Sequence, residues 1–567
     1  MPPIKKCLPP WLFGDKTHAK SDITAGLLMG VLVIPQSLGY AVLAGLPPVV
    51  GLYASIVPTL VYAYIGASNT QAVGPVAITA IMTAASLSTT SPESYVSSAA
   101  ALALLVGGIL WLASLLRLGW ITQFISQGVS AGFISAAAVL ILFSQLKGLL
   151  GLPLSGSDLS QMATGFFHHE GDFFNPATAT LGLISLMVLL MNRYRLSWLW
   201  GFLRAEHRLL TSRIFVLVWL GLATFITAQL QLDTPTVAAL ETSLPSRWQP
   251  PKLELLWQLL PDALLIALVA FVSTAAISDK LAKAENSPYA PSRELLGLGL
   301  ANVASSLTGG FSVAGGLSRT GLNVALGAKT PLASVICAGV ILVILLTAKD
   351  LLTGLPYAVL SAIIISSVFS MIDIDTLKTA YRHDKADMMA FLASFFGVCL
   401  FGLNIGLVMG LFASFAFLIY RSHQVHIAVV GQVGDSEHFR NIKRHQTTTF
   451  EGILLIRVDE SLYFGNATLV HDKLLETTLA KHTPPITELV LIMTAVNHVD
   501  LTAQAMLSRL NTTLKKHGIR LHFSEIKGPV MDKLTGTAVM TELTGSLFLS
   551  TRQAVTALSQ DRTRLCK

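Results

Sequence analysis

Charged side chains are scarce in this chain. Asp, Glu, Lys and Arg together make up 13% of the 567 residues, whereas hydrophobic residues make up 52%. Ordinary soluble domains carry about 25% charged residues, and soluble chains of this length divide into domains instead of building one very large apolar core. The composition therefore excludes a typical soluble enzyme and favours a membrane protein.

The usual signatures of catalysis and of metal or nucleic-acid binding are missing from the sequence. It has no phosphate-binding GxxxxGKS or GxxxxGKT run, no metal-ligand cluster, no nucleophile elbow and no polybasic tract. The cysteines lie far apart, without the spacing of a zinc site or a disulfide framework: Cys7, Cys337, Cys399 and Cys566. The first 20 residues hold four lysines but no apolar core, so we expect no cleavable signal peptide. We expect no enzyme, no cofactor and no metal.

The charge is unevenly distributed along the chain. Residues 1–430 hold 42 of the 71 Asp, Glu, Lys and Arg residues, and residues 431–567 hold the other 29. The second density is close to that of soluble domains. We therefore predict a cytoplasmic N-terminal segment at 1–21, a transmembrane domain at 22–425 and a soluble domain at 436–562.

Long apolar stretches fill the first of these regions. A helix needs about 20 apolar residues to cross a bilayer. Eleven stretches are long enough, near 23–46, 51–66, 95–116, 122–146, 176–192, 213–230, 258–278, 331–348, 356–372, 386–401 and 403–420. Three more are short or interrupted by Gly and Pro, near 74–88, 294–308 and 311–327. The sequence thus predicts an α-helical polytopic membrane protein with 14 transmembrane segments.

The arginines predict the orientation of these segments. If the chain starts in the cytoplasm and the segments alternate, the 193–213 loop lies inside. That loop holds five arginines: Arg193, Arg195, Arg204, Arg208 and Arg213. The opposite loops, near 150–175 and 231–257, hold little Lys or Arg. Because cytoplasmic loops are enriched in Lys and Arg, we expect both termini in the cytoplasm and the protein in the cell membrane, plasma or inner.

The C-terminal region has the pattern of a small α/β domain. Residues 453–458 and 489–494 are apolar runs of strand length. Residues 501–517 have helical spacing and end at Gly518, and residues 520–524 form the next strand-like run. Strands that alternate with helices indicate an α/β sheet.

Two short apolar segments begin with runs rich in Gly or Pro. One follows the run from Gln71 to Pro75, and the other follows the run from Phe311 to Thr320. Gly and Pro suit a place where extended chain turns into a half-helix. Matched breaks in two halves of a membrane protein point to a transporter site. Alternatively, the glycines only permit close packing of neighbouring helices.

The spacing before the two breaks agrees. Gly51, which opens the second segment, lies 24 residues before Pro75, and Glu294, which opens the ninth, lies 24 residues before Ser318. Two half-helix N-termini that face each other offer unpaired N–H groups and partial positive charge. Such a pair favours an anion.

Three polar residues near the breaks are candidates for contact with that anion. Arg319 is an ionisable residue at membrane depth, which is costly and therefore a functional hypothesis. Alternatively, it is a structural arginine that reaches the interface or pairs with a carboxylate. Gln36 and Tyr40 follow Pro35, which interrupts the first segment. Gln36 is suited to hydrogen-bond a substrate oxygen and Tyr40 to line the site, or both connect helices.

Three motifs resemble the signatures of the SulP sulfate permeases, the solute carrier 26 family. They are the run Pro35–Tyr53, the pair Gly74-Pro75 and the triplet Leu317-Ser318-Arg319. The C-terminal region resembles a STAS domain, with residues 462–467 and 490–500 in the expected places. The resemblance implies 14 segments in two inverted repeats of seven, divided into core and gate domains. It also implies an anion held between the third and tenth half-helices, elevator-like alternating access and homodimers.

The substrate-site positions of this family correspond to nine residues of the chain: Gln36, Tyr40, Val73, Gly74, Pro75, Gly316, Leu317, Ser318 and Arg319. One position departs from the family pattern. Many bacterial and plant members have a Glu in the eighth segment, suited to cation or proton coupling, and this coupling position is Ser273 here. Without a carboxylate there, we expect weak dependence of transport on a proton or sodium gradient.

The C-terminal region departs from its relatives at one helix start. Anti-anti-sigma proteins carry Asp-Ser-Ser-Gly and are phosphorylated on the second Ser, whereas this chain has Asp500-Leu501-Thr502-Ala503. Thr502 keeps a hydroxyl group, but the helix-opening Gly is missing. Because both residue types cap helices, the sequence favours Asp500 and Thr502 as an N-cap pair over a phosphorylation site.

The resemblance implies a secondary active transporter of a small inorganic anion, with sulfate as the first substrate to test. The alternatives are a bicarbonate or dicarboxylate transporter of the same family, and an anion channel or voltage-responsive membrane motor. The expected partners are the anion, a coupling ion (proton, sodium or counter-anion), membrane lipid and a second copy of the chain. We expect no nucleic acid.

Overall fold

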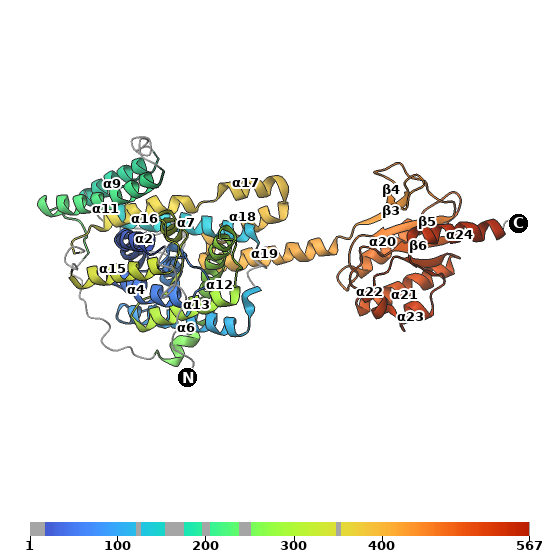
Figure 1. The fold of residues 1–567 in the computed structure, drawn as a ribbon, viewed down its shortest axis with the longest axis horizontal. Coiled ribbons are helices and arrows are strands. Elements are labelled where there is room, and N and C mark those ends of the chain that lie inside the picture. Colours follow the sequence, from blue (N-terminus) through green and yellow to red (C-terminus); the bar gives the residue numbers. More distant parts are fainter. Residues whose placement is uncertain are drawn as a thin grey trace. The chain divides into compact units, whose positions relative to one another are not determined.

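The computed structural model describes residues 18–120, 126–152, 175–194, 205–237, 251–347 and 353–565. The chain divides into two compact units, Met1–Ser414 and Phe415–Lys567. In Figure 1, the first is a bundle of helices and the second is a sheet flanked by helices.

Helices and short connections build the first unit. The bounds are α2 (Ala19–Leu32), α3 (Ile34–Leu43), α4 (Pro48–Ile65), α5 (Ala77–Ser86), α6 (Tyr95–Leu115), α7 (Gln127–Leu150), α9 (Pro176–Tyr194), α11 (Ala205–Gln229), α12 (Leu253–Ala284), α13 (Pro291–Leu307), α14 (Leu317–Ala325), α15 (Leu332–Thr347), α16 (Tyr357–Val368), α17 (Ile374–His383), α18 (Lys385–Phe401) and α19 (Leu403–His423). Each predicted apolar stretch overlaps one of these helices or a bent pair. The predicted start of the membrane domain at residue 22 falls inside α2, because the helix begins at Ala19.

Length and composition identify only part of the predicted membrane spans. Six described helices are long and apolar enough to cross a membrane alone, and α2 with α3, bent by 42°, makes a seventh. Among the shorter apolar helices are α5, α15 and α16. Large apolar side chains such as Phe225, Trp257 and Phe412 are exposed on the bundle. A surface of this kind is costly in water and is covered by lipid in a bilayer. The first unit is a helical polytopic membrane domain.

The first span bends where the sequence contains Pro35. Helix α2 ends at Leu32 and α3 begins at Ile34, so Pro35 lies in the first turn of α3. Pro is tolerated there because the N–H groups of a first turn have no helical partner. The predicted interruption of the first segment is confirmed, and it separates Gln36 from the preceding helix.

The two predicted breaks are short strands that pair with each other. Strands β1 (Val73–Gly74) and β2 (Ala314–Gly315) are antiparallel neighbours. The chain then passes from β1 into α5 and from β2 into α14. The prediction that extended chain turns into a short helix at both places is confirmed.

The membrane helices pack mainly in two groups. In one group α13 packs on α4 and α6, α15 packs on α2 and α4, and α12 packs on α6. In the other, α7, α9, α16 and α18 pack together. Small residues allow the closest approach, since a Cβ on Gly107 of α6 would lie 2.7 Å from the carbonyl oxygen of Gly299 on α13. This helix pair, which lies outside the two breaks, uses glycine for close packing.

The second unit contains a six-stranded sheet in the order β4-β3-β5-β6-β7-β8. The strands are β3 (Ile427–Gln432), β4 (Phe439–Asn441), β5 (Ile453–Val458), β6 (Glu488–Ile492), β7 (Arg520–Ser524) and β8 (Leu547–Phe548). The helices are α20 (Ala467–Leu479), α21 (Leu501–Lys516), α22 (Gly528–Leu534), α23 (Ala538–Thr541) and α24 (Thr551–Leu565). Strands β5 to β8 are parallel, and β3 is antiparallel to both of its neighbours.

Both faces of this sheet are covered, which explains its continuous apolar strands. Leu454 and Ile456 of β5 belong to the apolar core with α20 to α23, whereas Ile453 and Leu455 belong to the core with α24. The predicted α/β domain is confirmed. The runs 453–458 and 520–524 are strands over their whole predicted length.

The structure corrects two sequence-based details of this unit. A boundary at residue 436 would remove β3, which is hydrogen-bonded to β5, and Val425, which belongs to the apolar core. The cap of α21 consists of Asp500, whose Oδ1 accepts the N–H of Ala503 at 2.8 Å. Thr502 lies exposed in the first turn and is not the second member of a cap pair.

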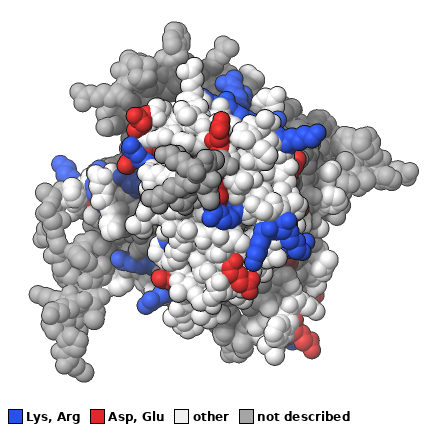
Figure 2. All heavy atoms as spheres, turned by 90° about the vertical axis from the view of Figure 1, so that its right-hand side faces the viewer, with Lys and Arg blue, Asp and Glu red and all other residues white. Residues whose placement is uncertain are grey.

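On the face shown in Figure 2, acidic and basic side chains are scattered among a larger uncharged surface. Mixed charge of this kind suits solubility and offers no single-sign field for a polyanion on the described residues in view.

Candidate functional site

The candidate site forms where α5 and α14 begin. The residues that precede these helices, Val76 and Gly316, are extended, and neither provides a side-chain cap. The first N–H groups of a helix have no partner within the helix, and the aligned peptide dipoles add partial positive charge at this end. Two such ends, brought together by the strand pair, suit an anionic ligand.

Hydroxyl groups from two helices hold the strand pair in place. Thr59 of α4 donates to the carbonyl oxygen of Val73 at 2.8 Å. The N–H of Gly315 donates to Thr274 Oγ1 of α12, also at 2.8 Å. The backbone of both strands is therefore fixed by buried side chains, so the helix ends are preorganised.

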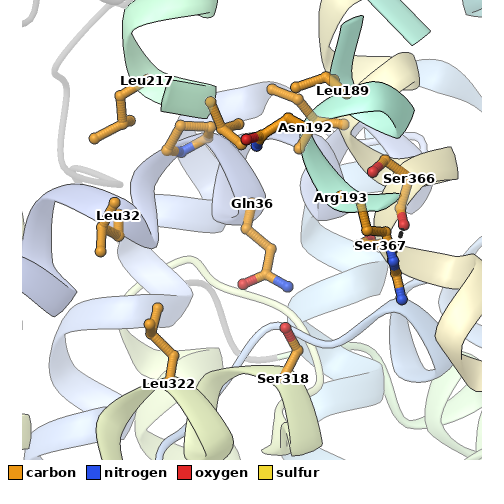
Figure 3. A pocket seen from close by; sticks show the side chains of 13 residues that line it. Leu32, Gln36, Leu189, Asn192, Arg193, Leu217, Ser318, Leu322, Ser366 and Ser367 are labelled. Atoms are coloured by element: carbon orange, nitrogen blue, oxygen red, sulfur yellow. Dashed lines mark hydrogen bonds between the residues drawn. The ribbon is translucent and has the colours of Figure 1, made fainter. Parts of the chain in front are cut away.

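A cavity of about 290 Å³ opens beside the N-terminal end of α14. It is lined by Leu32, Pro35, Gln36, Leu189, Asn192, Arg193, Val216, Leu217, Ser318, Leu322, Ile363, Ser366 and Ser367. In Figure 3 the amide of Gln36 points toward Ser318, and Arg193 lies beside Ser366 on another wall. The volume lies at the lower end of the range for small-molecule sites. The polar groups are amides, hydroxyls and one guanidinium, which together can bind an oxyanion.

Two of the nine predicted site residues, Gln36 and Ser318, line this cavity. Tyr40 lies directly behind them, because Gln36 Nε2 donates to its hydroxyl oxygen at 2.7 Å. Leu317 is exposed by 67% at the start of α14 and is not among the lining residues.

The remaining predicted positions contribute backbone or lie behind the strands. The residues Val73, Gly74, Pro75 and Gly316 are buried in or beside the strand pair. Their side chains do not line the cavity, so their contribution is to place the ends of α5 and α14.

Arg319 points away from the cavity into the protein. Its side chain is only 3% exposed, and Nη2 donates to the hydroxyl oxygens of Ser37 at 2.5 Å and Ser55 at 3.3 Å. None of the ion pairs among the described residues includes Arg319, and its Nε has no hydrogen-bond partner there. A Cβ on Gly74 would lie 2.0 Å from Nη1, so a larger residue here would displace the guanidinium. The guanidinium can therefore act on the site through its electric field, not by contact with the anion.

Comparison with known proteins identifies the chain. Residues 19–394 match the sulfate permease family, and residues 444–554 match the STAS domain. The chain belongs to the sulfate permease family. It is therefore an anion transporter of the SulP and solute carrier 26 group with a C-terminal STAS domain, and it is not an enzyme.

Plant sulfate transporters are among its relatives. The probable sulfate transporter 4.2 of Arabidopsis thaliana is 33% identical over 557 residues, which cover 96% of this chain and 81% of the plant protein. The chloroplastic sulfate transporter 4.1 of Arabidopsis thaliana is 32% identical and covers 89% and 75% of the two chains.

Solved structures share the fold. The murine anion transporter Slc26a9 in its inward-facing state superimposes with a TM-score of 0.88 at 22% identity, over 98% of this chain and 94% of that one. The transmembrane domain of the cyanobacterial bicarbonate transporter BicA superimposes with a TM-score of 0.58 at 21% identity, over 71% of this chain and 98% of that one.

Several cavity residues were not predicted from the sequence. The orientation argument assigned Arg193 to a cytoplasmic loop, whereas it lies near the end of α9 and donates Nη1 to the carbonyl oxygen of Ser366. The predicted 193–213 loop is also too long, because α11 begins at Ala205; Arg195 and Arg204 lie outside the described residues. Arg193 directly follows an apolar run in the sequence. A basic residue at that place can still extend into the membrane domain, and this position could have identified it as a cavity residue.

Ser273, at the predicted coupling position, turns its hydroxyl group to its own helix. The Oγ atom donates to the carbonyl oxygens of Val269 at 2.8 Å and Ala270 at 3.2 Å. A hydroxyl group engaged in this way has no remaining hydrogen for a ligand.

Proposed function

We propose that this member of the sulfate permease family is a secondary active transporter whose substrate is sulfate. The anion binds beside the N-terminal end of α14, with its negative charge directed at the helix ends of α5 and α14. Gln36 and Ser318 supply hydrogen bonds, Arg193 supplies a charge on the opposite wall, and Arg319 supplies a charge from behind.

The cavity between two groups of helices carries this proposal. Gln36 and Ser318 come from α3 and α14, on the side of the half-helices, whereas Arg193 and Ser366 come from α9 and α16 of the second group. A site whose walls belong to two packed bodies opens when one body slides against the other. We therefore propose elevator-like alternating access. The helices packed around α5 and α14 form the moving core, and α7, α9, α16 and α18 form the gate.

Relatives favour sulfate over other anions. The two plant relatives described above are named as sulfate transporters, at 32–33% identity over most of both chains. BicA, named as a bicarbonate transporter, shares the fold at 21% identity. Bicarbonate and dicarboxylate transport, and a channel mechanism, remain the alternatives that experiment must separate from sulfate transport.

We further propose 14 spans in two inverted repeats, both termini in the cytoplasm, a homodimer and a location in the plasma or inner membrane. The paired breaks at β1 and β2, one in each half of the membrane domain, support the repeat. The arginines between α9 and α11 support the orientation.

Uptake of labelled sulfate into proteoliposomes tests the function, with bicarbonate and succinate as competitors. We expect saturable uptake with a fixed stoichiometry against a counter-ion or co-ion. Gln36→Ala should raise the KM for sulfate about two- to tenfold, since a neutral hydrogen bond contributes about 0.5–1.5 kcal/mol. Ser97→Ala is the matched control, because Ser97 is exposed on α6 and does not line the cavity. Non-saturating flux without fixed stoichiometry would indicate a channel instead.

A further inference from the structure

A buried carboxylate lies behind the half-helices, outside the cavity. Glu294, in the first turn of α13, is 0% exposed. None of the ion pairs among the described residues includes it. Its neighbour Arg293 instead donates Nε to the carbonyl oxygen of Ile65 at 2.9 Å. A buried carboxylate without a counter-ion is costly in its ionised form.

Four oxygen–oxygen contacts join Glu294 to three residues in a closed ring. The Tyr62 hydroxyl lies 2.6 Å from Glu294 Oε1 and 3.1 Å from Gln71 Oε1. The Ser278 hydroxyl lies 2.8 Å from Glu294 Oε2 and 2.7 Å from Gln71 Oε1. Each contact of this length between two oxygen atoms needs one hydrogen atom between them.

With the carbonyl oxygen of Gln71 turned into the ring, too few hydrogen atoms are available if Glu294 is ionised. Tyr62 and Ser278 provide one hydroxyl hydrogen each, and Gln71 provides none, because its Nε2 is turned to the carbonyl oxygen of Thr274 at 3.1 Å. Two of the four contacts would then place oxygen lone pairs face to face in a buried site. A protonated Glu294 supplies a third hydrogen atom, so that only one contact is left without one.

We propose that Glu294 is a proton-binding site, occupied by a proton in this structure, and that the proton is exchanged with water during transport. The inference rests on the proposed transport function. It gives the chain a titratable group for proton coupling although Ser273 occupies the coupling position. The acid forms when a proton from water binds a carboxylate oxygen, and the carboxylate returns when that proton leaves.

The ring is connected to the anion site through two hydrogen bonds. Gln71 Nε2 donates to the carbonyl oxygen of Thr274, and Thr274 Oγ1 accepts the N–H of Gly315, directly before α14. The fit is close, because a Cβ on Gly315 would lie 2.1 Å from Gln71 Nε2. When the proton leaves, the Tyr62 and Ser278 hydroxyls both donate to the carboxylate, and their oxygen lone pairs then face the Gln71 carbonyl oxygen. The repulsion moves Gln71, and this movement is transmitted to β2 and α14.

Few other ionisable groups face this carboxylate. Tyr62 of α4 is a ring member, and the nearby groups on α12 and its connection to α13 are Asp279, Glu285 and Tyr289. Arg293 is adjacent on α13, and α6, which packs on α13, has no charged residue. Burial favours retention of the proton, whereas Arg293 and a hydrogen bond from the backbone of Ala67 oppose it.

Sulfate-driven proton movement tests the proposal in proteoliposomes that contain a pH-sensitive dye. In the wild type we expect a sulfate gradient to change the internal pH. Glu294→Gln keeps the size and hydrogen-bonding capacity of the side chain but cannot exchange a proton. It should reduce the sulfate-driven proton flux at least tenfold while sulfate still binds. Glu285→Gln is the matched control, since this nearby carboxylate is exposed, and it should behave like the wild type.

Infrared spectroscopy provides a second measurement that does not depend on transport. The wild type should show the carbonyl stretch of a buried protonated carboxyl group, with a shift in heavy water and a further shift in Tyr62→Phe. The proposal is overturned if this band is missing, or if Glu294→Gln retains wild-type proton flux. If the wild type transports no sulfate but shows the band, the substrate assignment fails and the proton site stands.

Discussion

The two units of the chain differ in how the charge of their buried ionisable groups is compensated. In the STAS domain, Glu488 is 4% exposed and accepts hydrogen bonds from Arg520 and His522, both at 2.7 Å. His522 Nδ1 accepts the N–H of Ser546, so Nε2 carries the hydrogen and the ring is neutral. Arg520 therefore compensates the charge of Glu488. In the membrane domain, Arg319 and Glu294 form hydrogen bonds to hydroxyl groups, and Glu294 also to the backbone of Ala67, and neither belongs to an ion pair among the described residues.

This difference separates architectural from functional charges. A buried ion pair satisfies both partners and is destabilising to break, which is the situation of Glu488. A buried charge without a counter-ion is retained in a membrane protein where transport needs it. In the proposed mechanism, the positive charge of Arg319 is compensated when an anion arrives, and the negative charge of Glu294 is removed by a proton. The following experiments test this distinction.

Gly74→Ala should have the largest effect of these substitutions. The new Cβ would lie 2.0 Å from Arg319 Nη1, and overpacking of this kind costs about 1–3 kcal/mol. It displaces both the guanidinium and β1, which leads into α5, so the loss of sulfate uptake should exceed that of Arg319→Ala. The matched control is Gly321→Ala on α14, where nothing lies within 4 Å. Equal uptake by the two variants would contradict the close fit between Gly74 and the guanidinium.

Arg319→Ala should weaken the binding of a divalent anion more than the binding of a monovalent one. A direct charged hydrogen bond contributes about 1.5–3 kcal/mol. Because the guanidinium acts through its field without contact, its removal should lower the affinity for sulfate by up to about tenfold. Arg319→Lys keeps the charge but not the planar guanidinium whose Nη2 donates to Ser37 and Ser55, so its effect should be intermediate. Calorimetry and transport KM for sulfate and a monovalent anion provide the measurement. A folded Arg319→Ala protein with unchanged KM for both would show that the arginine is structural.

Glu488→Gln should destabilise the STAS domain without a change in the KM for sulfate. Removal of a charged hydrogen-bond partner costs about 1–3 kcal/mol. The fragment for this measurement is 424–565, which keeps β3 and Val425, and its chemical denaturation gives the free energy of unfolding. An altered KM for sulfate in full-length Glu488→Gln would contradict the distinction between structural charges in the STAS domain and transport charges in the membrane domain.

Acid should weaken the same domain. Burial raises the pKa of Glu488, but the hydrogen bonds from His522 and Arg520 and the positive charge of Arg520 lower it by more, and the net pKa lies below its usual value. A lowered pKa in the folded state stabilises the domain above the unfolded value of about 4.3. This contribution is lost as the pH falls below about 4.3 through the folded pKa. In Glu488→Gln this part of the pH dependence of unfolding should be absent.

Ser318→Ala should have a small effect on the KM for sulfate. It removes one neutral hydroxyl group from the cavity, at about 0.5–1.5 kcal/mol, or roughly two- to tenfold in KM. Thr79→Val on α5 is the comparison, because the Thr79 hydroxyl already donates to the carbonyl oxygen of Val76 at 3.2 Å. If Thr79→Val raised the KM more than Ser318→Ala, the polar contact with the anion would lie on α5 instead of α14.

Local patterns were enough to predict most of the elements. Apolar length located the membrane helices, Gly and Pro located the strands before α5 and α14, and residues 453–458 and 520–524 were found as strands. The sequence-based boundary at 436 missed β3, because nothing local distinguishes an antiparallel edge neighbour from a linker. Asp500 was recognised as a helix cap because a cap acts on its own first turn.

The sequence by itself determined which segments are apolar, where they break and which family they belong to. Only the tertiary structure decided what each polar side chain faces. Ser318 and Arg319 are adjacent on one helix and point about 100° apart, so one enters the cavity and the other enters the protein. Helix periodicity does not say which, because the answer depends on Ser37 and Ser55 in other helices. The ring around Glu294 joins residues up to 232 positions apart, and such contacts arise only when the helices pack.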